Sequence, residues 1–348
     1  MKFYLFITSI LIVLFKTGNV LSDNNTFNVN NITISGKNSN NKQKIVNMAF
    51  KESFDKLISR LLLENDYTKV SNTDLNQIKK LISYYQIINT ETEPGLEKNL
   101  NFNVSFDKER MHDFFYKRNI LYSDVLNTEA IIFPLLKKND QFFLYNNNYF
   151  YENWNSDKNK DLIQFVLLSE NIENIQNVNL NKNNIYKIDI SNFFKEFTKE
   201  NIVFAHIEVN NKKADIYLNT RIEGKNIKKN LSLKNKDKLR ENEFYNKIII
   251  RINKIVIDLI KSQNLIDVRT PSFLNVKIQS TKKINLIKFS QRIKKIELID
   301  NFYVQQLNKD FVLVKIKYLG KIDKIIKKLK EQNMDLKMIS GQWQLQII

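Results

Sequence analysis

The sequence predicts an α+β protein with an N-terminal α/β region, a middle β-meander followed by a long helix, and a C-terminal ferredoxin-like unit of the order βαββαβ. Short runs with apolar residues at every second position, typical of strands, are mixed along the chain with longer runs at helical spacing. Hydrophobic residues make up 43% of the 348 residues, which is enough for a sizeable core. Glycine (6) and proline (3) are scarce, which argues against collagen-like and linker-rich architectures.

Residues 1–22 are predicted to be a secretory signal peptide. Lys2 precedes an apolar run over 3–15, and Val20 and Ser22 suit the −3 and −1 positions of a cleavage site. The run is shorter than the roughly 20 residues that a membrane-spanning helix needs. An uncleaved anchor stays open as the alternative. The mature chain is expected to begin near Asp23, to lack any transmembrane span and to be periplasmic.

The N-terminal domain is expected over residues 23–180. Helices are predicted over 42–64, from an N-cap at Asn72 or Thr73 through Ile82, after the N-cap Asp107, and over 148–162. Strands are predicted over 26–36, 100–106, 129–136, 141–145 and 163–169, and a turn over 90–95. Pro134 is expected to limit the pairing of the 129–136 strand, because proline has no backbone N–H.

The middle domain is expected over residues 181–268. A short helix over 191–197 precedes three strands, at 201–209, 214–222 and 229–234, which short polar turns would join into a meander. A long helix is predicted over 239–263, because its isoleucines and leucines recur at helical spacing. The stretch 268–272 contains proline and polar residues and is predicted to be the domain boundary.

The C-terminal domain, expected over residues 269–348, has the most regular pattern. Helices are predicted over 284–296 and 321–332, and strands over 273–279, 299–309 and 310–320, with two more strands around Gly341. The order strand, helix, strand, strand, helix, strand is that of a ferredoxin-like unit. We therefore expect four antiparallel strands with both helices on one face.

Cysteine content limits the chemistry that this chain can perform, and its charge limits the partners that it can bind. The chain has no cysteine, which excludes structural disulfides, thiol catalysis and a lipid-modified cysteine. The formal net charge is +18, which suits an anionic lipid or polymer as partner. The alternative is a compositional bias toward lysine, asparagine and isoleucine, in which the charges only solvate the surface. No nucleic acid is expected, because exported proteins rarely meet it and arginine is sparse.

No catalytic, metal-binding or cofactor-binding pattern stands out. The two histidines, His112 and His206, have no neighbours at metal-ligand or nucleophile spacing, and both are interpreted as ordinary core or surface residues. The chain also lacks a phosphate-binding loop and a G-x-S-x-G elbow. We therefore expect no metal, no cofactor and no enzyme activity. A hydrolase whose two carboxylates come from distant segments stays open as an alternative.

The stretch 142–155, FFLYNNNYFYENWN, is the most aromatic of the chain. One hypothesis is a core hairpin: Phe143 would share a strand face with Tyr145, asparagines 146–148 would form the turn, and Phe150 and Trp154 would share a helix face. The other hypothesis is a groove for a peptide or glycan, because several of these rings carry a polar group. The partner-binding residues of that groove would be Tyr145, Tyr149, Tyr151 and Trp154.

The segment 133–155 resembles a motif of the bacterial exported proteins of domain-of-unknown-function family 2066. In that family a strand that ends in a proline is followed by a second strand and a tryptophan-rich turn into a helix. Tyr145 departs from the pattern, since a tryptophan is usual there. The residues at the motif's proline, leucine, asparagine and two aromatic positions are Pro134, Leu144, Asn148, Phe150 and Trp154.

Three more segments, 32–62, 103–115 and 313–347, resemble the opening strand and long helix, the strand–Asp–helix junction and the closing helix and strand of the same family. Lys44 is the nearest basic residue to the position where the family has an arginine. The resemblance covers most of the mature chain. It implies export and a fold but no reaction, because the family has no assigned activity.

These observations together predict an exported, non-enzymatic binding or scaffolding module of the cell envelope, whose partner is an envelope protein. The first alternative is a peripheral binder of anionic lipid or polymer, motivated by the net charge and the basic segment 321–330. The second alternative is the hydrolase with distant carboxylates. The oligomeric state is left open.

Overall fold

The computed structural model describes residues 26–35, 42–89, 99–155, 163–198, 200–210, 213–279 and 284–348. The predicted signal peptide and the predicted turn over 90–95 lie outside these residues. Two compact units divide the chain. Unit 1 holds residues up to Leu57, Ser71–Asn119 and Val268–Ile348, and unit 2 holds Ile58–Val70 and Ile120–Asp267. Within the described ranges, no helix has the length and apolar character needed to cross a membrane.

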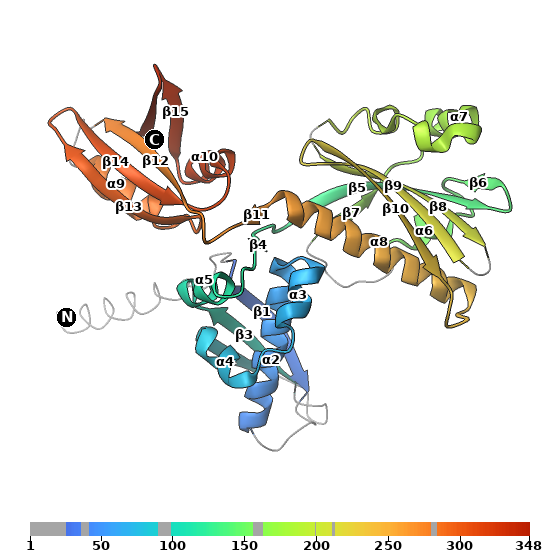
Figure 1. Ribbon diagram of the computed structural model, residues 1–348, viewed down its shortest axis with the longest axis horizontal. Coiled ribbons are helices and arrows are strands. Elements are labelled where there is room, and N and C mark those ends of the chain that lie inside the picture. The colour runs from blue at the N-terminus through green and yellow to red at the C-terminus, as the bar shows by residue number, and fades with distance from the viewer. Residues whose placement is uncertain are drawn as a thin grey trace, which may run out of the picture. The chain divides into compact units, whose positions relative to one another are not determined.

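Unit 1 begins with a three-stranded antiparallel sheet. Its strands are β1 (Asn28–Ser35), β2 (Ile82–Asn89) and β3 (Asn99–Phe106), in the order β1-β3-β2. Helix α2 (Lys42–Leu61) lies beside this sheet in Figure 1, and its Phe54 ring lies 6.2 Å from the Phe106 ring of β3. Alternate residues of β3, Phe102, Val104 and Phe106, are buried, which accounts for the predicted strand.

The helix predicted over 42–64 is confirmed as α2 and is three residues shorter than expected. Helix α2 ends at Leu61, and α3 (Glu64–Val70) follows. Lys261, a buried lysine, contacts the end of α2: its Nζ donates to the Ser59 oxygen at 2.6 Å and to the Leu62 oxygen at 2.8 Å. These are carbonyls that a helix end leaves without partners. Burial lowers the pKa of Lys261 to about 8, so a buried cation caps this helix end at neutral pH.

The second predicted helix is shorter than expected. Helix α4 covers Leu75–Leu81, and its N-cap is Asp74 rather than Asn72 or Thr73, because the Asp74 carboxylate accepts from the backbone of Asn76 and Gln77. The backbone turns extended at Ile82, where β2 begins. We did not predict this strand, although its isoleucines and tyrosines are typical strand residues.

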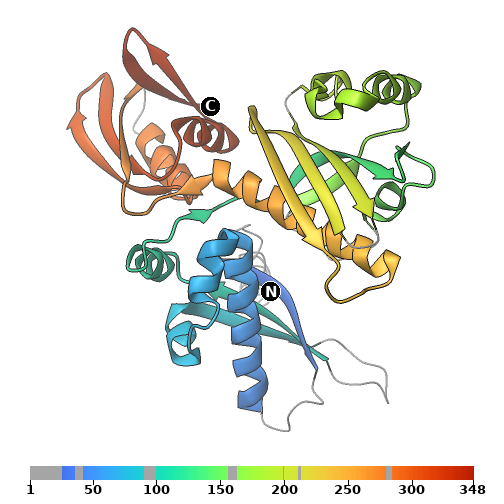
Figure 2. The ribbon, with the colours of Figure 1, turned by 45° about the vertical axis from the view of Figure 1, so that its right-hand side comes forward.

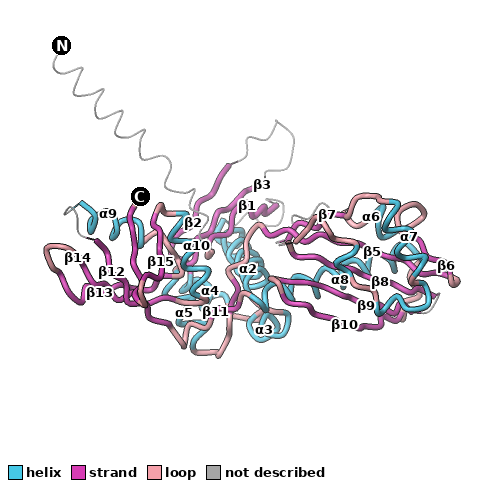
Figure 3. Tube along the Cα trace, turned by 90° about the horizontal axis from the view of Figure 1, so that it is seen from above, coloured by secondary structure: helices cyan, strands magenta, loops and turns pink. Residues whose placement is uncertain are grey.

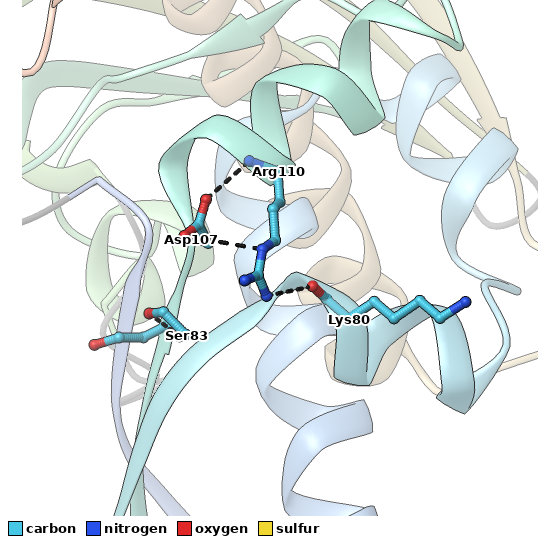
Figure 4. A network of polar contacts seen from close by, with 5 residues as sticks. Lys80, Ser83, Asp107 and Arg110 are labelled. Atoms are coloured by element: carbon cyan, nitrogen blue, oxygen red, sulfur yellow. Dashed lines mark hydrogen bonds and ion pairs between the residues drawn. The ribbon is translucent and has the colours of Figure 1, made fainter.

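The predicted N-cap Asp107 is confirmed. Its Oδ1 accepts from the Arg110 backbone N–H at 2.9 Å and begins helix α5 (Lys108–Tyr116). The Arg110 guanidinium reaches back and donates to the Lys80 carbonyl at 3.0 Å, as Figure 4 shows. This contact fastens the end of α4, where β2 starts, to the beginning of α5.

Unit 2 is built on one six-stranded sheet. Its path is β10 (Lys225–Lys234), β9 (Lys213–Ile222), β8 (Asn201–Asn210), β5 (Thr128–Lys138) and β6 (Gln141–Phe143), and β7 (Ile163–Leu167) also pairs with β5. The predicted meander and the strands of the predicted N-terminal domain therefore share one sheet, because β5 pairs in parallel with β8. The expected boundary at residue 180 is wrong for this reason. A separate pair joins β4 (Tyr122–Ser123) to β11 (Leu265–Ile266).

Helices cover both faces of this sheet (Figure 2). Helix α8 (Glu241–Gln263) packs Ile248, Ile252 and Val256 into the core on one face, which confirms the predicted long helix. On the other face lie α7 (Ile172–Leu180) and two 3-10 segments, η2 (Lys182–Lys187) and η3 (Ile190–Asn192). The helix predicted over 191–197 is only the end of η3 and a turn.

Pro134 lies in the middle of the central strand β5. On one side, β7 pairs with residues 128–132 and β6 with residues 136–138, so Pro134 falls in the gap between them. The Asn148 side chain occupies that gap and donates to the Pro134 carbonyl at 2.9 Å. The missing N–H of proline therefore costs no ladder hydrogen bond. This agrees with the expectation that Pro134 limits the pairing of its strand.

The C-terminal part of unit 1 has a five-stranded sheet, drawn with its helices in Figure 3. Its elements are β12 (Ser272–Gln279), α9 (Ile284–Ile293), β13 (Ile299–Leu307), β14 (Phe311–Tyr318), α10 (Ile322–Glu331), β15 (Met334–Ile339) and β16 (Gln342–Ile347). The order is β13-β14-β12-β16-β15. The expectation of four antiparallel strands is corrected, because β16 inserts beside β12 and runs parallel to it.

Candidate functional site

The turn in the aromatic stretch is organised by Asn148, whose side chain is fully buried. Its Oδ1 accepts from the Phe150 backbone N–H at 3.1 Å and caps α6 (Tyr149–Asn153), which is much shorter than the helix predicted over 148–162. Its Nδ2 donates to the carbonyls of Pro134, Phe143 and Leu144 at 2.8–3.0 Å. Asn147 has a φ of 59°. The predicted asparagine turn is therefore confirmed.

The four predicted partner-binding residues do not line a common groove. Tyr145 is buried on the α7 face of the sheet, where its ring stacks on Phe133 and its hydroxyl donates to the Ser169 carbonyl. Trp154 is buried on the α8 face, with its ring 6.2 Å from Phe165. A partner has no access to either ring in the folded protein.

Tyr149 and Tyr151 are partly exposed, but they too lie on opposite faces. The Tyr149 ring packs against Tyr245 on the α8 face and its hydroxyl donates to Asn246. Tyr151 packs on the α7 face and donates to the Leu168 carbonyl at 3.1 Å. The structure therefore favours the core interpretation of this stretch.

One detail of the core interpretation is wrong. Phe143 packs on the α8 face and Tyr145 on the α7 face, although alternation predicted a shared face. Strand β6 ends at Phe143, so the period of two no longer holds at Tyr145. Phe150 and Trp154 do share a face, as the helical spacing predicted.

His206 is the most unusual polar residue in the sheet. It is 1% exposed on β8, its Nε2 has no hydrogen-bond partner within the described residues, and its ring lies 5.4 Å from that of Tyr186. Burial lowers the pKa of His206 to about 4, with nearby Glu208 raising it and Lys137 lowering it. Burial also lowers the pKa of His112 to about 4. Both histidines are therefore neutral at pH 7, and neither belongs to a three-residue metal cluster among the described residues.

We expect the replacement His206→Phe to reduce the loss of stability in acid. An unfolded histidine titrates near 6.5 and the folded one near 4, so the unfolded state binds more protons between these values. The free energy of unfolding should therefore fall by about 2–3 kcal/mol through His206 alone as the pH drops from 7 to 4.5. Urea unfolding at both pH values checks this. An equal fall in the variant and in the wild type would contradict it.

The C-terminal sheet has one covered and one open face. Along β14, Val312, Val314 and Ile316 are buried, whereas the residues between them are partly exposed. The buried side faces the helices, since the ring of Phe289 in α9 lies 5.3 Å from that of Phe302 in β13. The opposite side, which we call the open face, carries Phe273, Lys277, Tyr303, Phe311, Lys315 and Lys317.

Rings and ammonium groups alternate on the open face. The Lys277 Nζ lies 4.4 Å from the ring centroid of Phe311, and the Lys315 Nζ lies 4.4 Å from that of Phe273. An aromatic ring attracts a cation without neutralising it. Lys317 differs, because it pairs with Asp300 at 2.7 Å, and this hydrogen bond raises the pKa of Lys317. Lys277 and Lys315 therefore keep a positive charge that an anion can use.

The rings of the open face are unusually exposed. Phe273 is 52% and Tyr303 is 49% exposed, although aromatic side chains are usually buried. A hollow of about 270 Å³ continues this face over β15 and β16, with Gln279, Lys337 and Gln344 among its lining residues. Asp335 also lines the hollow and pairs with Lys337 at 2.5 Å, so the hollow adds amide groups to the face but no unpaired cation. The face can therefore offer cations, exposed rings and amide groups to one ligand.

The sequence contained a signal for this face that we did not use. In residues 311–318 the buried positions are valine, isoleucine and tyrosine, and the positions between them are phenylalanine, leucine and lysine. Such alternation predicts a strand with one open side. The aromatic density of 142–155 suggested a binding site, but most of these aromatic side chains pack in the core.

Comparison with known proteins adds no relative. No family model, no curated protein and no solved structure matches this chain. The resemblance to domain-of-unknown-function family 2066 stays a prediction.

Proposed function

We propose that this protein is an exported, non-enzymatic binding protein that attaches through its open face to a membrane surface rich in anionic lipid headgroups. The observation that carries the proposal is the alternation of Lys277 and Lys315 with the exposed ring of Phe273 on β12 and the partly exposed ring of Phe311 on β14. Aromatic side chains favour the boundary between lipid and water, and lysines near an anionic surface each contribute about 1 kcal/mol of attraction.

The distribution of charge supports the same proposal. Residues 269–348 contain 17 lysines and arginines but only 6 aspartates and glutamates, so this part carries +11 of the net charge of +18. A compositional bias alone would spread lysines along the whole chain. Many of these charges belong to α9 and α10, which cover the other side of the sheet. The concentration therefore favours attraction of this part of the chain to an anionic surface, and Lys277 and Lys315 are the cations that favour the open face.

The remaining features of the proposal rest on the sequence. The signal peptide over 1–22 and a periplasmic location would bring the protein to a membrane surface. We further propose that the C-terminal part is a ferredoxin-like unit with one inserted strand, and that the chain is a relative of family 2066. The proposal includes no catalytic residue.

Flotation with lipid vesicles tests the proposal. We expect the protein to bind vesicles that contain phosphatidylglycerol more tightly than vesicles of phosphatidylcholine alone, and to be released by salt. The double variant Lys277→Gln, Lys315→Gln should bind the anionic vesicles about 30-fold more weakly, because it loses about 2 kcal/mol of attraction.

Lys228→Gln, Lys234→Gln on β10 is the matched control, since both lysines are exposed and the change of charge is the same. Equal weakening by both double variants would show that net charge alone drives binding and would contradict a site on the open face. Tighter binding to a single-stranded oligonucleotide than to either vesicle would replace the lipid by a nucleic acid. Retention by a protein partner at high salt would favour the scaffold hypothesis.

A further inference from the structure

The three-stranded sheet of unit 1 has no charged residue in its strands. β1, β2 and β3 contain no Lys, Arg, Asp or Glu, although these residues make up 26% of the chain. Half of the strand residues face α2, where charge is not expected. The other half, including Thr33, Asn101 and Asn103, face away from it and are uncharged as well. The sheet is therefore an uncharged surface within a chain whose net charge is +18.

Strand β2 is an edge of this sheet, and its side chains are exposed. It follows β3 at the end of the sheet order, and Tyr84, Tyr85 and Ile88 are 50%, 41% and 38% exposed. Large apolar side chains with this exposure are uncommon on an unprotected strand edge. The edge thus offers both unpaired backbone groups and apolar side chains.

The direction of the backbone groups follows from the ladder. The Phe106 N–H donates to the Phe27 carbonyl on the β1 side, so alternate residues of β3 point the other way, toward β2. These are Ser105, Asn103 and Asn101, and their partners on β2 are Tyr84, Gln86 and Ile88. The residues that alternate with these partners on β2 are Tyr85, Ile87 and Asn89. Their backbone N–H and C=O groups therefore point outward from the sheet.

Four other edge strands carry protective features that β2 lacks after Tyr84. β10 has four lysines, β15 has Asp335 and Lys337, and the ladder of β13 is interrupted by two register shifts. β1 has a register shift, next to which Asn31 adopts a φ of 58°. Charges and bulges of this kind prevent edge-to-edge pairing. Residues 84–89 of β2 form a regular, uncharged edge.

The base of β2 is held firmly. The Arg110–Lys80 contact in Figure 4 fixes the end of α4, and the Ser83 hydroxyl donates to the Ser105 carbonyl at 3.0 Å. The Tyr85 ring also contacts the Phe50 ring at 5.0 Å. An edge that is already ordered loses little conformational entropy when a second strand pairs with it.

We propose that β2 pairs antiparallel with β2 of a second copy of this chain, around a two-fold axis near Ile87, and that this edge makes the protein a weak homodimer. Tyr85 of each copy would then exchange backbone hydrogen bonds with Asn89 of the other. The occupant is a second copy because the strand is self-complementary and neutral, whereas two chains of net charge +18 repel one another elsewhere. The inference does not depend on the proposed function.

The test uses the full chain without its signal segment in analytical ultracentrifugation. Because the interface is small, we expect a dissociation constant between about 1 µM and 1 mM, so concentrations must span this range. Tyr85→Pro removes the outward N–H and should abolish the dimer. Tyr85→Ala is the matched control: it loses the same ring contact with Phe50 but keeps the N–H, and should still dimerise.

A second pair of variants guards against misfolding of the proline variant. Ile88→Lys places like charges next to the axis and should weaken the dimer at least 10-fold, with partial recovery at high salt, whereas Ile88→Thr should not. A monomer at all concentrations would overturn the proposal. So would a dimer that all four variants leave unchanged, because its interface would then lie elsewhere.

Discussion

Replacing Asn148 by leucine is expected to lower the free energy of unfolding by about 3–5 kcal/mol, because a buried amide would be lost together with its partners' hydrogen bonds. The Nδ2 group serves three carbonyls, and Oδ1 serves the first N–H groups of α6. Leucine has a similar volume, so the effect reports the hydrogen bonds rather than a cavity. Urea unfolding monitored by circular dichroism measures it.

Two further variants separate the roles of the Asn148 amide. Asn148→Ser keeps an oxygen that can cap α6 but has no amide to reach Pro134, and should cost less than the leucine variant. Asn148→Asp keeps the cap and the shape but places a carboxylate against three carbonyls, and should cost at least as much. If serine and aspartate are both as stable as the wild type, the contacts to Pro134, Phe143 and Leu144 contribute nothing.

Replacing Trp154 by alanine is expected to destabilise the protein by about 3–5 kcal/mol, because it removes a large side chain from the core between α6, β7 and α8. Trp154→Phe should cost much less, about 1 kcal/mol. The reason is that the Trp154 Nε1 has no hydrogen-bond partner in the described part of the chain, so phenylalanine gives up ring area but no hydrogen bond.

The Trp154 variants also separate the two interpretations of the aromatic stretch. Replacing a core residue lowers the free energy of unfolding and leaves ligand binding per folded molecule unchanged. Replacing a groove residue would weaken ligand binding and leave the free energy of unfolding unchanged. If Trp154→Ala unfolds at the same urea concentration as the wild type, the core interpretation is wrong, and ligand screening should return to Tyr149 and Tyr151, the two partly exposed tyrosines.

Local periodicity predicted most of the elements but not how they combine. The alternation in 100–106 and the helical spacing in 239–263 depend on neighbours along the chain, and both elements formed as expected. The boundary at residue 180 failed because the pairing of β5 with β8 joins residues about 70 positions apart. A pairing at that distance leaves no mark on local composition. The insertion of β16 beside β12 was missed for the same reason.

The amino-acid sequence by itself determined the class of this protein, the positions of its longer helices and strands, the asparagine turn at 146–148 and the absence of cysteine chemistry. These properties follow from side-chain periodicity, turn preferences and composition, which act over a few residues. Only the tertiary structure decided which side of each strand meets water. It placed Tyr145 and Trp154 in two separate cores and left Phe273, Lys277 and Lys315 on an open face. The physical reason is that burial depends on what packs against a strand, and the covering helices come from distant parts of the chain.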